Sequence, residues 1–321
     1  MDPQHAVIGI DLGGTHVRLG LVRDGRVTGL RKQAMGGLRA PAEVVAFLAA
    51  EVRALHAEYG AAAAVGVGVP GIVDPQAGIV LRAPHYPVWR GFPMRQALSD
   101  ALGCPVAIDN DANAIALGEA RYGAGKGLTN FCLLTLGTGV GGGIVLNDQL
   151  WRGDAGFAGE VGHIVIEFQG HPCPCGGMGH WEQYCSASGL ANLIDASDDP
   201  QKIEFLRPFH GESTLVTGTV LLQLAQAGNI FANTLWKKFG AYLGAGVASL
   251  TGVLGVEHFV IGGGLVAAWD FFIPEARRSL ARRIYPELAQ RVVLQRAALG
   301  DEGGILGAAA LVTVPEGGPC G

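Results

Sequence analysis

The chain opens with two short hydrophobic runs separated by a glycine turn. Val7 to Asp11 and Val17 to Val22 are rich in β-branched and apolar residues, and Gly13-Gly14-Thr15 lies between them. This pattern predicts two strands joined as a hairpin. In residues 41–59, hydrophobic side chains recur every three or four positions, which predicts an amphipathic helix, and Val65 to Val69 is typical of a buried strand.

A similar order begins again near residue 130. Phe131 to Leu136 predicts a strand, Gly137-Thr138-Gly139 a turn, and the segment through Ile144 and Val145 a second strand. The chain therefore has two related halves, each of which starts with a hairpin around a glycine turn.

Predicted strands and helices alternate along the rest of the chain, which indicates an α/β fold. Between the two halves, Val106 to Ile108 forms a short strand, and an Ala-rich helix follows it and ends at Gly123. Further elements are predicted as helices at residues 215–240 and 242–255, a strand at 258–261 and an Ala-rich helix at about 303–312.

Composition narrows the class of protein. The chain has 321 residues, about twice the usual domain length, so two domains are expected. Its net charge is -5, from 23 basic and 28 acidic residues, and no long run of Lys or Arg occurs, so the electrostatic pattern of a nucleic-acid binder is missing. The 51 glycines follow no collagen-like period and therefore indicate many tight turns and close backbone approaches.

Targeting signals and disulfides are not expected. The opening residues MDPQHAVIGID lack the basic start, apolar stretch and cleavage site of a signal peptide, so we expect a cytoplasmic protein. Two uncharged windows, residues 127–147 and 239–256, are interrupted by Gly, Thr, Ser or Asn, so no membrane span is predicted. Six cysteines in a long chain without a signal peptide argue against a disulfide framework.

Three glycine-rich turns are candidate phosphate sites. Asp11-Leu12-Gly13-Gly14-Thr15 combines glycine amides with a hydroxyl and a carboxylate that can face a nucleotide and its magnesium, although it lacks the GK[ST] of a Walker A loop. Leu136 to Gly143 repeats this arrangement in the second half, and Gly262-Gly263-Gly264 would offer flat backbone to a purine. Each could be an ordinary turn, but two at equivalent places favour a phosphate clamp.

Polar residues gather after the strand at residues 106–108. Asp109, Asn110 and Asp111 stand where the N-cap of a helix is expected, and Asp111 alone could be that cap. Asn110 and Asn113 give the cluster more hydrogen-bonding capacity than a cap needs, which suits a polyhydroxyl ligand. The pattern therefore favours a binding site over a simple cap.

The segment GEVGHIVIEFQGHPCPCGGMGHWEQYCS, residues 159–186, contains three histidines, three cysteines and three glutamates. Cys173-x-Cys175 followed by His180 offers thiolate and imidazole donors that suit zinc, and the further candidates are His163, His171 and Cys185. A thioredoxin-like redox pair would be Cys-x-x-Cys, so Cys-x-Cys disfavours that function. Structural zinc is the favoured interpretation, and a catalytic metal and a metal-free segment are the alternatives.

Five stretches together carry a resemblance to a known family. They are IGIDLGGTHVRLGLV (8–22), GVPGIVD (68–74), IDNDANAIALGEARYGAGKG (108–127), LGTGVGGGIVLN (136–147), and GEVGHIVIE with CPCGGMGHWE (159–182). In this order they resemble the ROK family of sugar kinases, a branch of the actin-like, hexokinase-type ATPase fold, and most of all its bacterial glucokinases. The resemblance covers nearly the whole chain.

The resemblance implies an α/β fold of two lobes, with duplicated β-hairpin phosphate loops and a cleft between the lobes. The small N-terminal lobe would comprise residues 1–118, with the C-terminal helix 303–321 packing back on it, and the large lobe residues 119–302 with a zinc-binding knuckle. ATP, Mg²⁺ and a structural Zn²⁺ are the implied cofactors, and a homodimer or homotetramer is the implied assembly.

The resemblance also implies roles for individual residues. Asp111 would be the catalytic base, and His163 would bind zinc through one ring nitrogen and the sugar through the other. The implied sugar ligands are Asn110, Glu160, His163, Glu182 and Gly71. The implied nucleotide-binding residues are Asp11, Gly13, Gly14, Thr15, Thr138, Gly139, Gly263 and Gly264.

Three positions bear on the metal and the sugar. His180 stands where the family usually has a third cysteine, which leaves a two-Cys, two-His set of His163, Cys173, Cys175 and His180. His85, in APHYPVW, stands where many relatives carry an Asn near the sugar. Glu160, in GEVGH, points toward glucose or N-acetylglucosamine, because N-acetylmannosamine kinases often lose this acid.

We expect ATP-dependent phosphorylation of an aldohexose, glucose at its 6-hydroxyl, by a protein without nucleic-acid or membrane partners. One alternative is a kinase for N-acetylglucosamine, N-acetylmannosamine or another hexose. A second, from a different class, is a sugar-responsive regulatory protein without turnover, which the presence of Asp111 disfavours. Repressor members of the family carry an N-terminal helix-turn-helix, and only a few residues precede the first predicted strand here.

Overall fold

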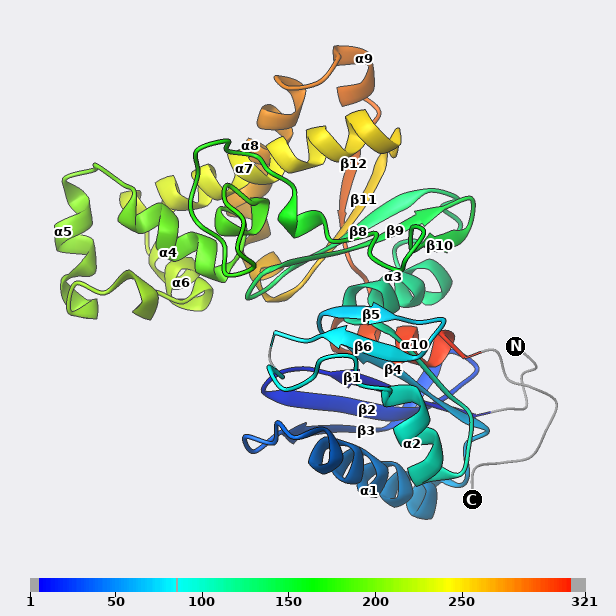
Figure 1. The fold of residues 1–321 in the computed structure, drawn as a ribbon. Helices are drawn as coiled ribbons and strands as arrows, with labels where there is room; N and C mark the ends of the chain where they lie inside the picture. Colours follow the sequence, from blue (N-terminus) through cyan, green and yellow to red (C-terminus); the bar gives the residue numbers. More distant parts are fainter. Residues whose placement is uncertain (1–5, 85, 313–321) are drawn as a thin grey trace. The chain divides into compact units, whose positions relative to one another are not determined.

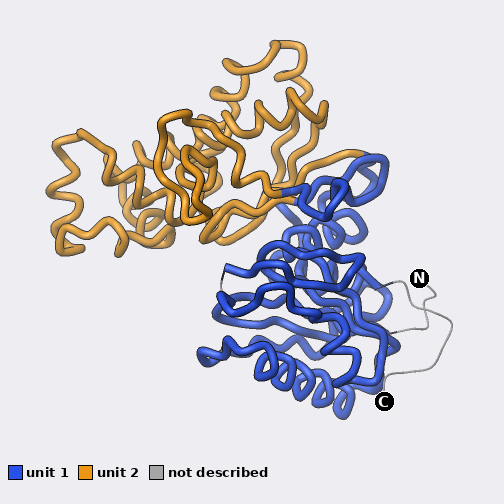
Figure 2. The backbone as a smooth tube through the Cα atoms, in the orientation of Figure 1, with its two compact units in different colours: residues 1–129, 143–159, 297–321 blue, residues 130–142, 160–296 orange. Residues whose placement is uncertain are grey.

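The computed structural model describes residues 6–84 and 86–312. The chain forms two compact units (Figure 2). Unit 1 comprises residues 1–129, 143–159 and 297–321, and unit 2 comprises residues 130–142 and 160–296. The predicted small lobe was residues 1–118 with 303–321, and the predicted large lobe was residues 119–302. Three parts of that predicted large lobe, residues 119–129, 143–159 and 297–302, belong to unit 1 instead.

The sheet of unit 1 has the strand order β3-β2-β1-β4-β7 (Figure 1). Its first three strands pair antiparallel, whereas β4 and β7 join parallel to β1. The predicted hairpin and the two later strands are confirmed, but β3 was not predicted, because its exposed and half-buried sequence RVTGLRKQA contains no hydrophobic run. The strands are β1 (Val7–Leu12), β2 (His16–Arg23), β3 (Arg26–Ala34), β4 (Ala64–Val69) and β7 (Val106–Asn110).

Helices cover both faces of this sheet (Figure 1). Ile8 and Ile10 of β1 pack with Leu48 of the first helix in one hydrophobic cluster, and Val7 packs with Ile305 of the last helix in another. Successive strand residues point to opposite faces, so both faces of β1 are buried. The helices of the unit are α1 (Pro41–Tyr59), α2 (Met94–Leu102), α3 (Asp111–Tyr122) and α10 (Gly303–Ala310), and a small ribbon is formed by β5 (Ile72–Asp74) and β6 (Ile79–Arg82).

Helix α10 lies directly on the backbone of β1 and β4 because glycines face it. A Cβ atom on Gly66 would lie 1.8 Å from the carbonyl oxygen of Ala308, and one on Gly9 would lie 2.0 Å from that of Ile305. Any side chain at these positions would push the helix away from the sheet. Two of the many glycines therefore serve a close approach between helix and sheet.

Glu119, near the end of α3, fixes the segment that leads into α10. Its carboxylate is 1% exposed. It accepts hydrogen bonds from the backbone N–H groups of Ala124 (2.6 Å), Ala298 (3.0 Å) and Leu299 (3.0 Å). One buried side chain thus satisfies three amides from two distant parts of the chain.

We expect Glu119→Ala to lower the free energy of unfolding by about 3 kcal/mol or more, because each buried amide left without a partner costs about 1–3 kcal/mol. Glu119→Gln is the matched control. It keeps one acceptor oxygen but turns an NH₂ group toward one amide, so about a third of that loss is expected. Urea unfolding followed by circular dichroism measures both, and an alanine variant as stable as the wild type would contradict the assigned role.

The second sheet has the order β10-β9-β8-β11-β12. Strands β10 and β9 pair antiparallel, and β11 pairs parallel with both β8 and β12. A hairpin at one side and parallel strands at the other repeat the order of the first sheet, which confirms the two related halves. The strands are β8 (Phe131–Leu136), β9 (Val140–Leu146), β10 (Gln149–Trp151), β11 (His258–Gly262) and β12 (Val293–Arg296).

The helices of unit 2 divide at a different point from the one predicted. The helical break lies at residues 227–229 and not at 241, because Gly228 has a φ of 84° and Asn229 caps the next helix by accepting the N–H of Ala232 at 2.9 Å. Gly240 permits close packing instead, since a Cβ there would lie 2.2 Å from the carbonyl oxygen of Phe272. The helices are α4 (Ala187–Asp195), α5 (Gln201–Leu206), α6 (Gly218–Gln226), α7 (Ile230–Leu254), α8 (Trp269–Ala281) and α9 (Pro286–Ala289).

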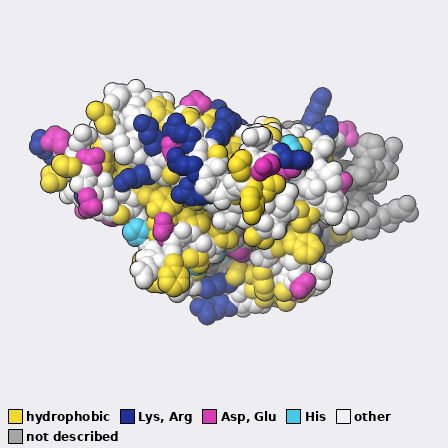
Figure 3. Space-filling model, turned by 90° about the horizontal axis from the view of Figure 1, so that it is seen from above, with side chains coloured by type: hydrophobic (Ala, Val, Ile, Leu, Met, Phe, Trp, Pro, Cys, Tyr) yellow, Lys and Arg dark blue, Asp and Glu magenta, His cyan; other side chains and the backbone are white. Residues whose placement is uncertain are grey.

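Charged side chains of both signs share the face shown in Figure 3. There, several Lys and Arg side chains gather near the middle, and Asp and Glu lie at the edge of that group and elsewhere on the face. Within residues 6–84 and 86–312, no helix combines the length and apolar character that a membrane crossing needs.

The cysteines differ in their state. Cys173, Cys175 and Cys185 of the predicted metal segment are free thiols. Cys104, by contrast, is disulfide-bonded, so the chain has a disulfide bond although the sequence predicts no disulfide framework.

Candidate functional site

The loop between β1 and β2 contains the first predicted phosphate motif. The N–H of Gly13 donates to the carbonyl oxygen of His16 at 2.9 Å, and the Tyr86 hydroxyl donates to that of Gly13 at 2.7 Å. The carbonyl oxygen of Thr15 accepts from the N–H of Met35 at 2.9 Å. Backbone hydrogen bonds and the Tyr86 hydroxyl therefore hold the loop, and Thr15 is exposed.

Asp11 stands at the end of β1, where the sequence places a magnesium-orienting carboxylate. Burial raises the pKa of this carboxyl group, and the guanidinium of Arg18, 3.3 Å away, opposes the shift. A Cβ atom on Gly304 would lie 2.7 Å from the Asp11 carboxyl carbon, so the carboxylate lies against the start of α10. Arg18 favours the charged form, which is the form a divalent cation binds.

In unit 2, the structure brings the other two glycine motifs together. Gly263 has a φ of 90°, and a Cβ on it would lie 2.4 Å from the carbonyl oxygen of Leu136 at the end of β8. The loop Gly137-Thr138-Gly139 begins at the next residue, and the N–H of Gly137 donates to the carbonyl oxygen of Gly139 at 3.0 Å. Apart from its chain neighbours, no residue in the described part of the chain has a heavy atom within 4 Å of a Cβ built on Gly264, so this backbone is open there.

The polar cluster after β7 combines a helix cap with an acid. Asn110 is the N-cap of α3, because its Oδ1 accepts from the N–H groups of Ala112 (2.9 Å) and Asn113 (3.1 Å). Its Nδ2 donates to the carbonyl oxygen of Gly71 at 2.9 Å, which joins two predicted sugar-binding residues. Asp111 is the first residue of α3 and is partly exposed, so the capping alternative belongs to Asn110.

Asp109, which the sequence places in this cluster, and Arg152, which was not predicted, support the junction. The Asp109 side chain is 2% exposed. It accepts from Arg152 Nε at 2.7 Å, from the N–H of Asn110 at 2.7 Å and from Asn113 Nδ2 at 3.0 Å. An acid after a strand was visible in the sequence, but its partner is 43 positions away and no local pattern marks it. The pair holds in place the backbone that presents Asp111.

The four predicted metal ligands lie together in unit 2. One ligand atom each from His163, Cys173, Cys175 and His180 lies within 4.8 Å of all the others. The separations are 3.2 Å between the two histidine Nδ1 atoms, 3.3 Å from Cys175 Sγ to His180 Nδ1, and 3.9 Å from Cys173 Sγ to His163 Nδ1. Tetrahedral zinc would place two nitrogens about 3.3 Å apart and nitrogen and sulfur about 3.6 Å apart. The donor set therefore fits a zinc ion.

The two remaining donors of the segment have other contacts. Cys185 is fully buried and its thiol donates to the carbonyl oxygen of Phe239 at 3.7 Å. The His171 ring packs against Tyr184, with 5.3 Å between the ring centres. Of the further candidate metal ligands that the sequence offered, His171 and Cys185 therefore lie outside the cluster.

Two carboxylates adjoin the cluster. His163 Nδ1 faces the other donors, and its Nε2 is 3.7 Å from the carboxylate of Glu160, whose pKa is raised by burial. Glu182 Oε1 accepts from the thiol of Cys173 at 3.1 Å, and burial raises the pKa of that thiol to about 12. Predicted sugar ligands and predicted metal ligands therefore touch one another within unit 2.

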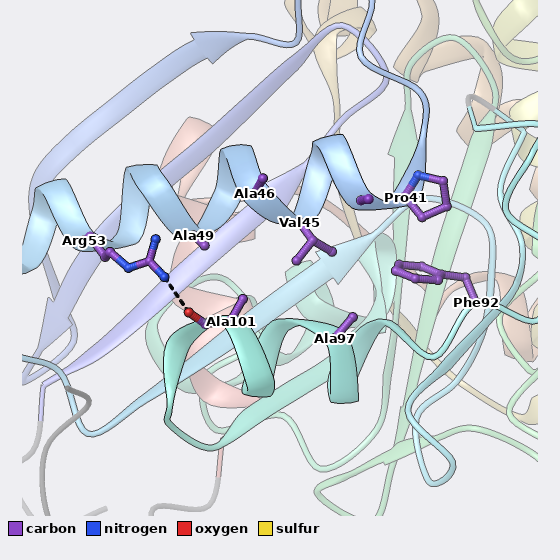
Figure 4. A pocket seen from close by; sticks show the side chains of 9 residues that line it. Pro41, Val45, Ala46, Ala49, Arg53, Phe92, Ala97 and Ala101 are labelled. Atoms are coloured by element: carbon purple, nitrogen blue, oxygen red, sulfur yellow. Dashed lines mark hydrogen bonds between the residues drawn. The ribbon is translucent and has the colours of Figure 1, made fainter.

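A pocket of about 540 Å³ between α1 and α2 is not part of this chemistry (Figure 4). Its walls are mostly alanine, with Val45, Pro41 and Phe92. Its charged lining residue, Arg53, donates to the carbonyl oxygen of Ala101 at 2.6 Å. The lining offers no acid, thiol or imidazole. His85, the remaining residue that the sequence associates with the sugar, lies outside the described residues.

Comparison with known proteins agrees with the two sheets and the motifs. The glucokinase of Halalkalibacterium halodurans is 33% identical over 316 residues, 96% of this chain and 95% of that protein. The crystal structure of a ROK family glucokinase from Streptomyces griseus, in complex with glucose and AMPPNP, is 34% identical, with a TM-score of 0.82 over 95% of this chain and 98% of that chain. The xylose repressor of Caldicellulosiruptor bescii is 32% identical over 248 residues, 77% of this chain and 62% of that protein.

These similarities confirm the actin-like, hexokinase-type ATPase fold that the sequence motifs predict. The family model described as "ROK family" matches residues 7–314, which is nearly the whole chain. The chain therefore belongs to the ROK family.

Proposed function

We propose that this chain, a sugar kinase of the ROK family, transfers the γ-phosphoryl group of ATP to the 6-hydroxyl of an aldohexose, and that this hexose is glucose. The observation that carries the proposal is the β7–α3 junction, where Asn110 caps the helix and Asp111 remains at its first position. Phosphoryl transfer requires mainly positioning and neutralisation of charge, because its transition state is loose.

Asp111 accepts the proton of the sugar hydroxyl. Its place at the start of α3 lowers its basicity, since the helix N-terminus favours the carboxylate form. A weak base is sufficient, because in a loose transition state the proton leaves the hydroxyl late. The Asp109–Arg152 pair keeps the junction, and hence this carboxylate, in one position.

The polar groups assigned to the sugar hydroxyls are Asn110 and the backbone at Gly71, which a hydrogen bond joins. Glu160, His163 and Glu182 are assigned to them as well, and both carboxylates lie near the His163 ring. Carboxylates accept hydrogen bonds from hydroxyl groups, and the Nε2–H of an imidazole bound to a metal through Nδ1 donates one, so these side chains suit a polyol.

The glycine loops bind the nucleotide. Asp11 orients magnesium. Phosphate oxygens accept hydrogen bonds from backbone N–H groups and hydroxyls, which both hairpin loops expose. The loop residues assigned to the nucleotide are Gly13, Gly14, Thr15, Thr138, Gly139, Gly263 and Gly264.

His163, Cys173, Cys175 and His180 hold a structural zinc ion. Bound zinc supplies a fixed tetrahedral centre, and four protein ligands leave it no open position for substrate. With Nδ1 directed to the metal, His163 keeps its Nε2–H as a donor for a sugar oxygen, and Glu160 lies 3.7 Å from that nitrogen. The knuckle therefore fixes the direction of the sugar-binding side chains.

A panel of hexoses and N-acetylhexosamines, assayed by ADP release, tests the substrate. We expect glucose to have the highest kcat/KM. A higher value for N-acetylglucosamine or N-acetylmannosamine would replace glucose with that sugar. Binding of a sugar without any ADP release would favour the regulatory alternative. The similarity to a xylose repressor is the observation that supports this alternative.

We expect Thr138→Val to raise the KM for ATP about tenfold and to leave the KM for sugar nearly unchanged, because one hydrogen bond to a charged phosphate is worth about 1.5–3 kcal/mol. Thr138→Ser keeps the hydroxyl and is the matched control, with a KM for ATP near that of the wild type. Steady-state kinetics in both substrates measure these values. A loss confined to sugar would show that the loop serves the other ligand.

A further inference from the structure

A short segment, residues 182–188, connects the Cys-His knuckle with the loop Gly137-Thr138-Gly139 inside unit 2. At its start, Glu182 Oε1 lies 3.1 Å from Cys173 Sγ. Its other oxygen lies against Gly139, since a Cβ built on that glycine would be 2.7 Å from Oε2. One carboxylate therefore touches both a predicted metal ligand and the predicted phosphate loop.

Hydrogen bonds join the other end of the segment to the same loop. The N–H of Ala187 donates to the carbonyl oxygen of Gly137 at 2.9 Å. The hydroxyl of Ser188 donates to the carbonyl oxygen of Thr138 at 2.9 Å. Two successive carbonyl groups of the loop are thus fixed by two successive residues at the start of α4.

Ser186 ties these contacts back to Glu182. Its hydroxyl is fully buried, donates to the carbonyl oxygen of Glu182 at 2.6 Å and accepts from the N–H of Gly189 at 3.0 Å. It also lies 3.0 Å from the hydroxyl of Ser188. The proton of each hydroxyl goes to a carbonyl oxygen, that of Ser186 to Glu182 and that of Ser188 to Thr138, so the two hydroxyls are in contact without a hydrogen bond between them. Ser186 therefore fixes the backbone between Glu182 and the start of α4, which carries Ser188.

Fixing a carbonyl group also fixes the next amide. A peptide unit is planar, and its C=O and N–H point in opposite directions. With the Gly137 and Thr138 carbonyls held by α4, the N–H groups of Thr138 and Gly139 both turn away from α4. Successive amides directed to one side are what an anion such as a nucleotide phosphate requires.

We propose that Ser188 is a positioning residue that couples sugar binding at Glu182 to ATP binding at Thr138 and Gly139. A sugar that orders Glu182 also orders residues 186–188, which hold the phosphate loop in its binding conformation. ATP therefore binds more tightly when sugar is present, and sugar more tightly when ATP is present, as linkage requires. This inference rests on the proposed kinase function.

Calorimetric titration with AMPPNP, with and without glucose, tests the coupling, and steady-state kinetics give both KM values. In the wild type we expect glucose to tighten AMPPNP binding several-fold. Ser188→Ala removes one hydrogen bond, so we expect AMPPNP affinity in the presence of glucose to fall about three- to tenfold. Glucose should then hardly change AMPPNP affinity, and the affinity for glucose in the absence of AMPPNP should stay the same. Ser188→Thr keeps the hydroxyl and should restore the coupling.

Ser249→Ala is the matched control, because the exposed Ser249 hydroxyl also donates to a backbone carbonyl, that of Ala245, at 3.2 Å. It should leave both affinities unchanged. If the wild type phosphorylates glucose but Ser188→Ala keeps the full effect of glucose on AMPPNP, the coupling is refuted and the kinase function stands. If Ser188→Ala weakens glucose binding in the absence of AMPPNP as much as AMPPNP binding in the absence of glucose, Ser188 has only a structural role. A wild type without hexose turnover would instead refute the function on which the inference rests.

Discussion

Asp111→Asn is expected to lower kcat by at least about 10²-fold, the usual scale for losing a positioned base, and to leave sugar affinity within a few-fold. The amide keeps the shape of the side chain and an oxygen that can accept from the N–H of Ala112, as Oδ1 of Asp111 does at 2.9 Å. Asn110, which caps α3, is untouched, so the helix start should remain in place. The substitution therefore removes the proton acceptor and little else.

Turnover and sugar binding must be measured separately to read this result, by ADP release and by calorimetry. Asp100→Asn is a suitable control, because Asp100 is exposed and accepts only from Gln96 Nε2, at 2.7 Å, among the hydrogen bonds described for its carboxylate. It should leave kcat unchanged. A kcat near that of the wild type for Asp111→Asn would remove Asp111 from the role of base.

The second large effect is expected at His180. His180→Ala removes one of the four clustered donors, and we expect the protein to lose its zinc, to unfold at lower temperature and to bind sugar at least about tenfold more weakly. These losses should occur together, because Glu182 and His163 contact the same cluster. His180→Cys supplies a thiolate in place of the imidazole, so near-normal zinc content and activity are expected.

Elemental analysis of purified protein gives the zinc content, about one ion per chain being expected for a four-ligand site. His171→Ala is the informative control, because the His171 ring packs on Tyr184 and should not be needed for the metal. Wild-type protein without zinc, or a His180→Ala variant with full zinc content and sugar affinity, would show that the ligand set is wrong. Loss of zinc with unchanged sugar affinity would show that the metal site does not position the sugar-binding side chains.

Local periodicity by itself determined much of the fold. The helix predicted over residues 41–59 is α1, Pro41–Tyr59, and the strand predicted at Phe131 to Leu136 is β8. Such elements are set by the spacing of buried side chains along a short stretch, which the sequence displays directly. The exposed strand β3 was not predicted, because an edge strand with few buried residues shows no regular spacing of buried side chains.

The sequence also determined which side chains are available for chemistry. Cys173, Cys175 and His180 are close in the chain, so their gathering around one point follows from a single tight turn, in which Gly176 has a φ of 102°. His163 was one of three further candidates from the residues, and only the family pattern preferred it to His171 and Cys185. Short-range geometry thus gave the ligand types, and the fold excluded His171 and Cys185 from the cluster.

Only the tertiary structure decided the contacts that hold these groups in position. Arg152 meets Asp109 across 43 residues, Glu119 meets Leu299 across 180, and Ser188 meets Thr138 across 50. Each is a polar pair in which either partner could have bonded to water or to a nearby backbone group, so nothing local selects the partner. Strand order and helix packing bring each pair within hydrogen-bonding distance, and burial then makes the contact obligatory for Asp109 and Glu119, because an unpaired buried polar group is costly.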